Sequence, residues 1–137
     1  MNRKTRRPLL RLAARVPGLY LLLAFPAARR ITVRGESMLP ALSPGERVLF
    51  DRLAFDLRRP RRGDIVLARH PALPGLLVIK RVAESGADGY RLLGDNPAES
   101  TDSRALGLFR RRDILARAWL VYWPPERFRL LGRARGT

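Results

Sequence analysis

From Glu46 onward the chain alternates between short apolar runs and breaks made of Gly, Pro or charged residues, and this alternation is what most constrains the fold. The runs are rich in β-branched and aromatic residues and occupy positions 48–50, 64–68, 76–82, 90–93 and 114–122. Such runs between turn formers predict the strands of coiled antiparallel sheets. With 137 residues, 46% of them hydrophobic, the chain is long enough for one domain with its own core. We therefore expect an all-β fold.

The first 30 residues differ in composition from the rest, so we expect an N-terminal arm (1–30) ahead of one domain (31–137). Before Glu36 there are nine basic residues and no acidic one. These are Arg3, Lys4, Arg6, Arg7, Arg11, Arg15, Arg29, Arg30 and Arg34. The apolar run 16–28 contains Pro17, Gly18 and Pro26, and as a helix it would reach only about 20 Å against about 30 Å of hydrocarbon. We expect a peripheral arm on an anionic membrane surface. The same order of features also resembles a signal peptide.

Charge and the absence of cysteine narrow the classes of partner. The net charge of +16 suggests nucleic acid or an anionic membrane as partner. Because no base-reading motif is present, we expect no nucleic acid, although a basic binding module without catalysis, or an Arg-rich composition without function, remains an alternative. Without cysteine there is no disulfide or thiolate site, and the single His70 cannot form a multi-histidine site. We expect no metal and no cofactor.

Ser37 is a candidate nucleophile in the segment Gly-Glu-Ser-Met-Leu-Pro, residues 35–40. It follows the β-branched run 31–33 and precedes the turn formers of 40–45, so it lies where a strand ends and a side chain can face a cleft. The alternative is a turn serine that hydrogen-bonds its own backbone.

Lys80 is a candidate base because it is a rare lysine in an arginine-rich chain and follows an apolar run. Of the 28 Lys and Arg residues only Lys4 and Lys80 are lysines, and Lys80 ends the apolar run 76–79. Arginine is not deprotonated in proteins, whereas burial can lower the pKa of a lysine far enough for it to act as a base. The alternative is a lysine that extends to water. Serine with a desolvated lysine is a known pair of nucleophile and base.

Four motifs in order carry a family resemblance. They are Ser-Met-x-Pro (37–40), Arg-Gly-Asp-Ile-Val (62–66), Lys-Arg-Val (80–82), and Gly-Asp-Asn (94–96) with Ser-x-Asp-Ser-Arg (100–104). Together they resemble the type I signal peptidases, family S26, over residues 31–124. Arg-His-Pro (69–71), Gly-Asp-Asn-Pro (94–97) and Tyr-Trp-Pro (122–124) are most similar to the small branch of nickel-type superoxide dismutase maturation proteases.

The resemblance implies a fold of coiled antiparallel sheets like those of signal peptidases and SOS repressors, with Ser37 as nucleophile and Lys80 as general base. It implies that Ser100 orients the Lys80 amine, while Asp102 and Arg104 form an ion pair that holds their loop.

For substrate, the resemblance implies that Met38, Val78 and Ile79 line shallow pockets for small side chains. The oxyanion would be bound by the Ser37 N–H, since Gly35 stands where family members often have a hydroxyl. The expected partner is a precursor protein with an N-terminal leader, such as a nickel superoxide dismutase precursor. A general signal peptidase for secreted proteins is the alternative, although membrane signal peptidases usually carry a complete spanning anchor ahead of the serine.

Two further alternatives remain. His70, in Arg-His-Pro at an expected strand end, could serve as base of a Ser/His/Asp hydrolase, although no spacing ties it to Ser37. A self-cleaving repressor shares the serine and lysine, but about thirty residues ahead of Ser37 are too few for a helix-turn-helix domain.

Overall fold

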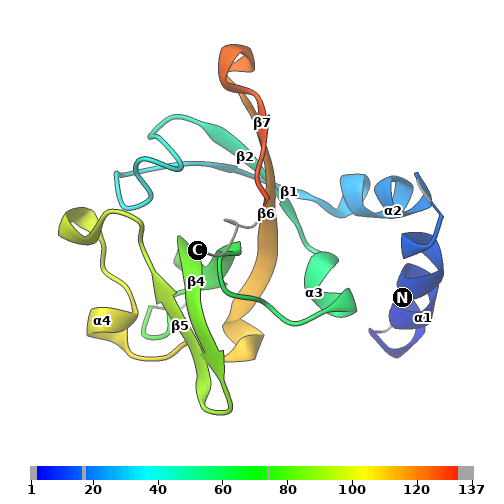
Figure 1. Cartoon of the computed structure of the whole chain (residues 1–137), viewed down its shortest axis with the longest axis horizontal. Coiled ribbons are helices and arrows are strands. Elements are labelled where there is room, and N and C mark those ends of the chain that lie inside the picture. Colours follow the sequence, from blue (N-terminus) through cyan, green and yellow to red (C-terminus); the bar gives the residue numbers. More distant parts are fainter. Residues whose placement is uncertain (1–2, 17, 74, 133–137) are drawn as a thin grey trace.

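An antiparallel sheet of seven strands dominates the computed structural model, which describes residues 3–16, 18–73 and 75–132 (Figure 1). The strands are β1 (Arg29–Thr32), β2 (Arg47–Asp51), β3 (Ile65–Arg69), β4 (Leu77–Gly86), β5 (Gly89–Leu93), β6 (Ile114–Trp123) and β7 (Arg129–Leu130). The helices are α1 (Arg3–Ala14), α2 (Leu19–Ala27), α3 (Ala54–Leu57) and α4 (Ser103–Leu106), with 3-10 turns η1 (Pro97–Glu99), η2 (Arg111–Asp113) and η3 (Pro125–Arg127). Every run predicted as a strand forms one, so the all-β prediction is confirmed.

The order of the strands brings distant parts of the chain together. Neighbouring strands follow the order β1-β2-β6-β3-β4-β5, and β7 pairs with β6. The ten-residue strand β6 therefore pairs with three others, and Figure 1 shows it running through the middle of the molecule. In the β3–β4 pair, Val66 lies opposite Lys80. The candidate base thus lies within a strand that is paired on both sides.

Apolar side chains cover both faces of the central strands, which explains why those runs are almost continuously apolar. On β3, Ile65 and Leu67 belong to one core cluster, whereas Val66 and Ala68 belong to another. Successive side chains of a strand point to opposite faces, so β3 is buried on both sides. The coiled sheet therefore encloses two cores that share this strand.

The N-terminal residues form two short helices that pack on the sheet domain. Leu10 of α1 is 1% exposed and packs with Ala24 of α2 and Leu53. The Tyr20 hydroxyl donates to Asp51 at 2.5 Å, and burial together with that hydrogen bond raises the pKa of Tyr20. Arg6 forms an ion pair with Asp56. The arm is therefore docked by both apolar and polar contacts.

The sheet begins inside the segment that the sequence assigns to the arm. Arg29 and Arg30 are the first residues of β1 and pair with Phe50 and Leu49. Within the described ranges, none of the helices combines the length and the apolar character that crossing a bilayer would require.

Candidate active site

Lys80 lies in the interior of the sheet domain. Its side chain is 4% exposed, and it shares its face of β4 with Val78 and Val82, because side chains alternate along a strand. Burial lowers the pKa of the Lys80 amine; nearby Asp102 opposes the shift and Arg104 reinforces it. An amine in these surroundings is a base that becomes neutral below the pH range of an ordinary lysine.

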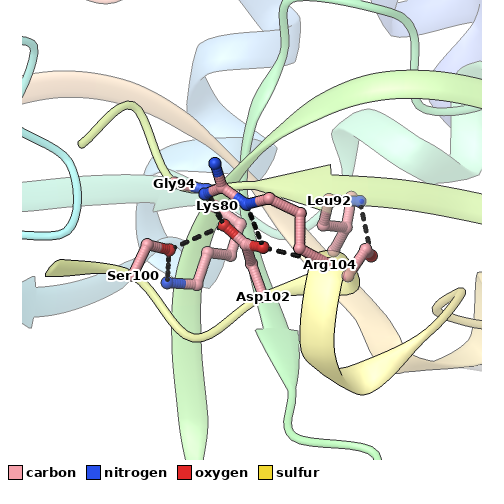
Figure 2. Close-up of polar contacts among 7 residues, drawn as sticks. Lys80, Leu92, Gly94, Ser100, Asp102 and Arg104 are labelled. Atoms are coloured by element: carbon pink, nitrogen blue, oxygen red, sulfur yellow. Dashed lines mark hydrogen bonds and ion pairs between the residues drawn. The ribbon is translucent and has the colours of Figure 1, made fainter. Parts of the chain in front are cut away.

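One hydrogen-bonded chain connects Lys80 to a buried carboxylate (Figure 2). Lys80 Nζ donates to Ser100 Oγ at 2.9 Å, and Ser100 Oγ lies 2.8 Å from Asp102 Oδ2. Asp102 is 1% exposed. The structure therefore brings together Lys80 from β4 and the loop that carries Ser100 and Asp102.

Asp102 is ionised because its hydrogen bonds outweigh its burial. Burial alone would raise the pKa of this carboxyl, but donors surround it and hold the pKa well below its usual range. Arg104 Nε donates to Oδ1 at 2.9 Å, and the Gly94 N–H donates to Oδ2 at 2.8 Å. Arg104 also forms the predicted ion pair with Asp102. The carboxylate thus joins the loop to the end of β5.

The charge on Asp102 sets the direction of every hydrogen bond in the chain. An ionised carboxylate only accepts, so the hydroxyl proton of Ser100 must point to Asp102. Ser100 Oγ then has lone pairs left, and it must accept from Lys80. A neutral Lys80 amine that donates one N–H to Ser100 keeps its lone pair for another partner. The arrangement therefore orients a base and leaves its basic electron pair unused.

Ser37 lies against the same loop. The Ser37 carbonyl oxygen accepts from Asn96 N at 2.9 Å, and Asn96 Nδ2 donates to the Glu36 carbonyl at 3.1 Å. A Cβ placed on Gly94 would lie 2.2 Å from Ser100 Oγ and 2.8 Å from the Ser37 carbonyl oxygen. Only a glycine permits this approach. Gly94 therefore lies where the segment around Ser37 contacts Ser100, the hydrogen-bond partner of Lys80.

The side chain of Ser37 is half-buried, and among the described residues its hydroxyl makes no hydrogen bond, either to its own backbone or to Lys80 Nζ. Catalytic hydrogen bonds are often long in a free enzyme and tighten when substrate binds. A hydroxyl without a local backbone partner differs from that of an ordinary turn serine.

The residues expected to contact substrate are distributed over several surfaces. Met38 is 2% exposed and packs in the first core cluster. Val78 lies on the Lys80 face of β4, whereas Ile79 lies on the opposite face and packs against the first cluster. Val78 and Ile79 therefore border different sides of the strand. Gly35 has a φ of 74° with open space where a Cβ would be, a conformation that favours glycine.

Two clamps around the site were not anticipated from the sequence. In the first clamp, Arg129 holds the turn that follows Ser37. It donates to both carboxylate oxygens of Glu46, at 2.6 and 2.9 Å, and to the Ala41 carbonyl at 2.7 Å. Glu46 Oε1 accepts from Ser43 N at 2.6 Å. No local pattern connects Glu46 with Arg129, because they are 83 positions apart.

The second clamp joins three of the motifs. Arg81, next to Lys80, donates to both carboxylate oxygens of Asp95 at 2.8 Å and to the Gly63 carbonyl at 2.9 Å. All three are motif residues, with Gly63 in 62–66, Arg81 in 80–82 and Asp95 in 94–96, and this shared membership was a signal that could have predicted their contact.

His70 is not brought to this network. Its Nδ1 accepts the backbone N–H groups of Ala72 and Leu73 at 3.1 and 3.0 Å. It lies four residues along the chain from Val66, the partner of Lys80, which corresponds to roughly 13 Å of strand. His70 shapes the β3–β4 connection. Across the residues with a described placement, no group of three His, Cys, Asp or Glu side chains could hold a metal ion.

Comparisons with known proteins match most of this chain to one family. The family model described as "Signal peptidase, peptidase S26" matches residues 7–89 and 83–123. The mitochondrial ATP-independent inner membrane protease subunit 1a of Arabidopsis thaliana is 34% identical over 121 residues, covering 70% of this chain and 71% of that protein. Signal peptidase I of Leptolyngbya laminosa is 28% identical over 145 residues, covering 73% and 71%. Mitochondrial inner membrane protease subunit 2 of Mus musculus is 31% identical over 121 residues, covering 72% and 69%.

Proposed function

This chain belongs to the peptidase S26 family of signal peptidases, and on that premise we propose that it is a serine endopeptidase with Ser37 as nucleophile and Lys80 as general base. The observation that carries the proposal is the buried Lys80 amine, whose bond to Ser100 leaves its lone pair unused. The position of Gly94 between Ser100 and the Ser37 carbonyl supports the pairing.

The proposed reaction needs only protein groups. Neutral Lys80 removes the proton from Ser37 Oγ, which attacks the scissile carbonyl carbon and forms a tetrahedral oxyanion. The Ser37 backbone N–H stabilises that oxyanion, with no side-chain hydroxyl at Gly35 to assist. Protonated Lys80 then gives its proton to the leaving amine. Water, deprotonated by Lys80, hydrolyses the acyl-enzyme and regenerates Ser37.

The proposed substrate is the N-terminal leader of a precursor protein, bound as an added strand with small side chains near Met38, Val78 and Ile79. The motifs Arg-His-Pro, Gly-Asp-Asn-Pro and Tyr-Trp-Pro support a nickel superoxide dismutase precursor as the substrate. The likeness to signal peptidase I supports the second candidate, a range of secreted precursors.

The N-terminal arm is proposed to place the enzyme on an anionic membrane surface. Its helices combine basic side chains with exposed apolar ones, of which Leu22 is 72% exposed. Helices of this kind bind the interface between headgroups and acyl chains.

The test compares Ser37→Ala with wild type on a peptide that carries a small-residue leader, with Ser85→Ala on the exposed part of β4 as a matched control. We expect no detectable cleavage by Ser37→Ala, unchanged cleavage by the control and the same thermal midpoint for all three, since a half-buried hydroxyl contributes little to stability. Cleavage by folded Ser37→Ala would overturn the mechanism. Parallel digestion of a nickel superoxide dismutase precursor and a secretory precursor separates the two substrate candidates.

A further inference from the structure

A basic cavity lies at the far end of the β4–β5 hairpin from Lys80. Its volume is about 710 Å³, within the range of small-ligand sites. It is lined by parts of α1, α3, the hairpin turn and residues 110–112. Lys80 and Gly86, which lines the cavity, are six residues apart on β4, roughly 20 Å along the strand. The cavity is therefore separate from the candidate active site.

The charges around this cavity are strongly unbalanced. Seven arginines and two aspartates line it. Arg6 holds one of the aspartates, Asp56, in an ion pair, so that acid is not available to neutralise the lining arginines. Asp88 lies at the hairpin turn. The cavity therefore presents a large excess of positive charge.

Two of the seven lining arginines have partners within the protein. Arg58 donates to both oxygens of Asp64, at 2.8 and 3.1 Å, and Arg111 donates to the Phe55 carbonyl at 2.8 Å. Their guanidinium groups lie 5.7 and 5.4 Å from the centre of the Phe55 ring, as in cation–π contacts. Phe55 thus contacts both of these arginines at the edge of the cavity.

The other five arginines are available to a ligand. Within the part of the chain that the structure describes, none of the five forms an ion pair with an acidic side chain. They are Arg7, Arg11, Arg59, Arg110 and Arg112. Guanidinium groups bind phosphate oxygens in a bidentate manner. One phosphodiester carries a single negative charge, so five cations match a ligand with more than one phosphate.

We infer that this cavity binds the headgroup of an anionic phospholipid that carries two phosphates. The choice of lipid rests on the arm that supplies Arg7 and Arg11. The arm exposes six large apolar side chains, namely Leu9, Leu12, Val16, Leu21, Leu22 and Phe25. Apolar side chains beside cations suit the boundary between headgroups and acyl chains, whereas a nucleic acid needs the cations alone. Bound lipid would join α1 to the sheet domain at the membrane surface.

The test measures binding to vesicles with equal nominal charge. One set contains cardiolipin, which has two phosphates per molecule, and the other contains phosphatidylglycerol at twice the mole fraction. We expect wild type to bind the cardiolipin set at least about tenfold more tightly, because a defined site adds bidentate contacts to the diffuse attraction that both sets share. Equal affinities for the two sets would overturn the inference.

A pair of double variants tests whether the lipid binds in this cavity. The double variant Arg59→Gln/Arg110→Gln removes two cavity cations outside the arm, and Arg62→Gln/Arg127→Gln removes the same charge from exposed positions that do not line the cavity. We expect the cavity variant to lose the preference for cardiolipin and the control variant to keep it. Loss of the preference in both variants would show that net charge alone is responsible, and would overturn the inference.

Two further experiments distinguish lipid from nucleic acid as the ligand, and lipid binding from peptidase activity. A duplex oligonucleotide that displaces wild type from cardiolipin vesicles, but does not bind the cavity variant, would identify nucleic acid as the ligand and overturn the lipid. Cleavage of a soluble leader peptide without vesicles should be the same in wild type and the cavity variant. Because vesicle binding is measured without substrate, it stands whether or not the proposed peptidase activity does.

Discussion

The two ends of the β4–β5 hairpin differ in whether their charged side chains are paired with opposite charges. At the Lys80 end, Asp102 is paired with Arg104 and hydrogen-bonded to Ser100 and Gly94, and it is almost completely buried. At the Gly86 end, several arginines border an open cavity without acidic partners among the described residues. Catalysis by a lysine needs one defined protonation state, whereas binding of an anion needs positive charge that nothing within the protein neutralises.

The compensation of the Asp102 charge at the Lys80 end affects the pKa of the Lys80 amine. An unbalanced carboxylate near Lys80 would raise the pKa of the amine and keep it protonated, and Asp102 does act in this direction. The positive charge of Arg104 acts against it. The ion pair therefore keeps the hydrogen bond from Ser100 to Asp102 while limiting the rise that Asp102 causes in the pKa of Lys80, the proposed base.

The largest expected effect comes from removing the proposed base, Lys80, while keeping its positive charge. We expect Lys80→Arg to be as inactive as Lys80→Ala, because a guanidinium with a pKa above about 12 does not release its proton at a usable pH. Loss of a general base typically lowers the rate about a hundred- to ten-thousandfold. Turnover of a leader peptide is the measurement. A rate for Lys80→Arg within tenfold of wild type would show that Lys80 acts only through its charge.

The pH profile of wild type belongs to the same experiment. Because burial lowers the pKa of Lys80, the neutral amine forms at a lower pH than in a free lysine. Activity should therefore rise with pH through one ionisation below the ordinary range of lysine. A flat profile through that range would argue against a lysine base.

An intermediate effect is expected when the compensation alone is removed. In Arg104→Gln the charge of Asp102 is no longer balanced, so the pKa of Lys80 should rise and the activity profile should move to higher pH. On the rising limb, each pH unit of displacement lowers the rate at fixed pH about tenfold. The hydrogen bonds from Gly94 and Ser100 should keep Asp102 ionised.

High pH separates this electrostatic effect from damage to the loop. If Arg104→Gln only shifts the pKa of Lys80, its rate should approach the wild-type plateau once the amine is neutral. Arg91→Gln, which breaks an exposed ion pair with Glu84, is the control and should leave the profile unchanged. A rate that stays low at every pH would mean that Arg104 serves to hold the loop.

The fold could be predicted from the sequence wherever the strands follow the simple pattern of apolar runs between turn formers. Runs such as 64–68 and 114–122 became β3 and β6 nearly residue for residue. The N-terminal boundary was less accessible, because Arg29 and Arg30 continue the basic composition of the arm although they are paired in β1. Helix α1 was not predicted at all. Its buried face consists of Leu10 and Ala13, which is recognisable only once the surface that covers them is known.

The residues of the candidate site could be predicted from the sequence, but the hydrogen bonds that connect them could not. The family resemblance implied that Ser100, Asp102 and Arg104 belong with Lys80, and the structure brings these four together. The direction of the hydrogen bonds depends on the ionisation of Asp102, which follows from burial and donors that a sequence does not display. The contact of Arg129 with Glu46 depends on the pairing of β6 with β7, and long-range pairing of that kind leaves no local signal.

The smallest effect is expected at the cavity, in the stability of the protein without ligand. Arginines that face one cavity without acidic partners repel one another, so Arg59→Gln/Arg110→Gln should raise the thermal midpoint at low salt, by about 2 °C for a domain of this size. The rise should shrink as salt is added, because the screening length falls to about 3 Å at 1 M. The control Arg62→Gln/Arg127→Gln changes the net charge equally but removes no cavity cation, so its rise should be smaller. Equal rises in both variants would mean that only the net charge is unfavourable, and the contrast between the two ends of the hairpin would then be one of composition and not of local arrangement. A rise confined to the cavity variant would show that the protein keeps these arginines together at a cost in stability, which is what a site for an anion requires.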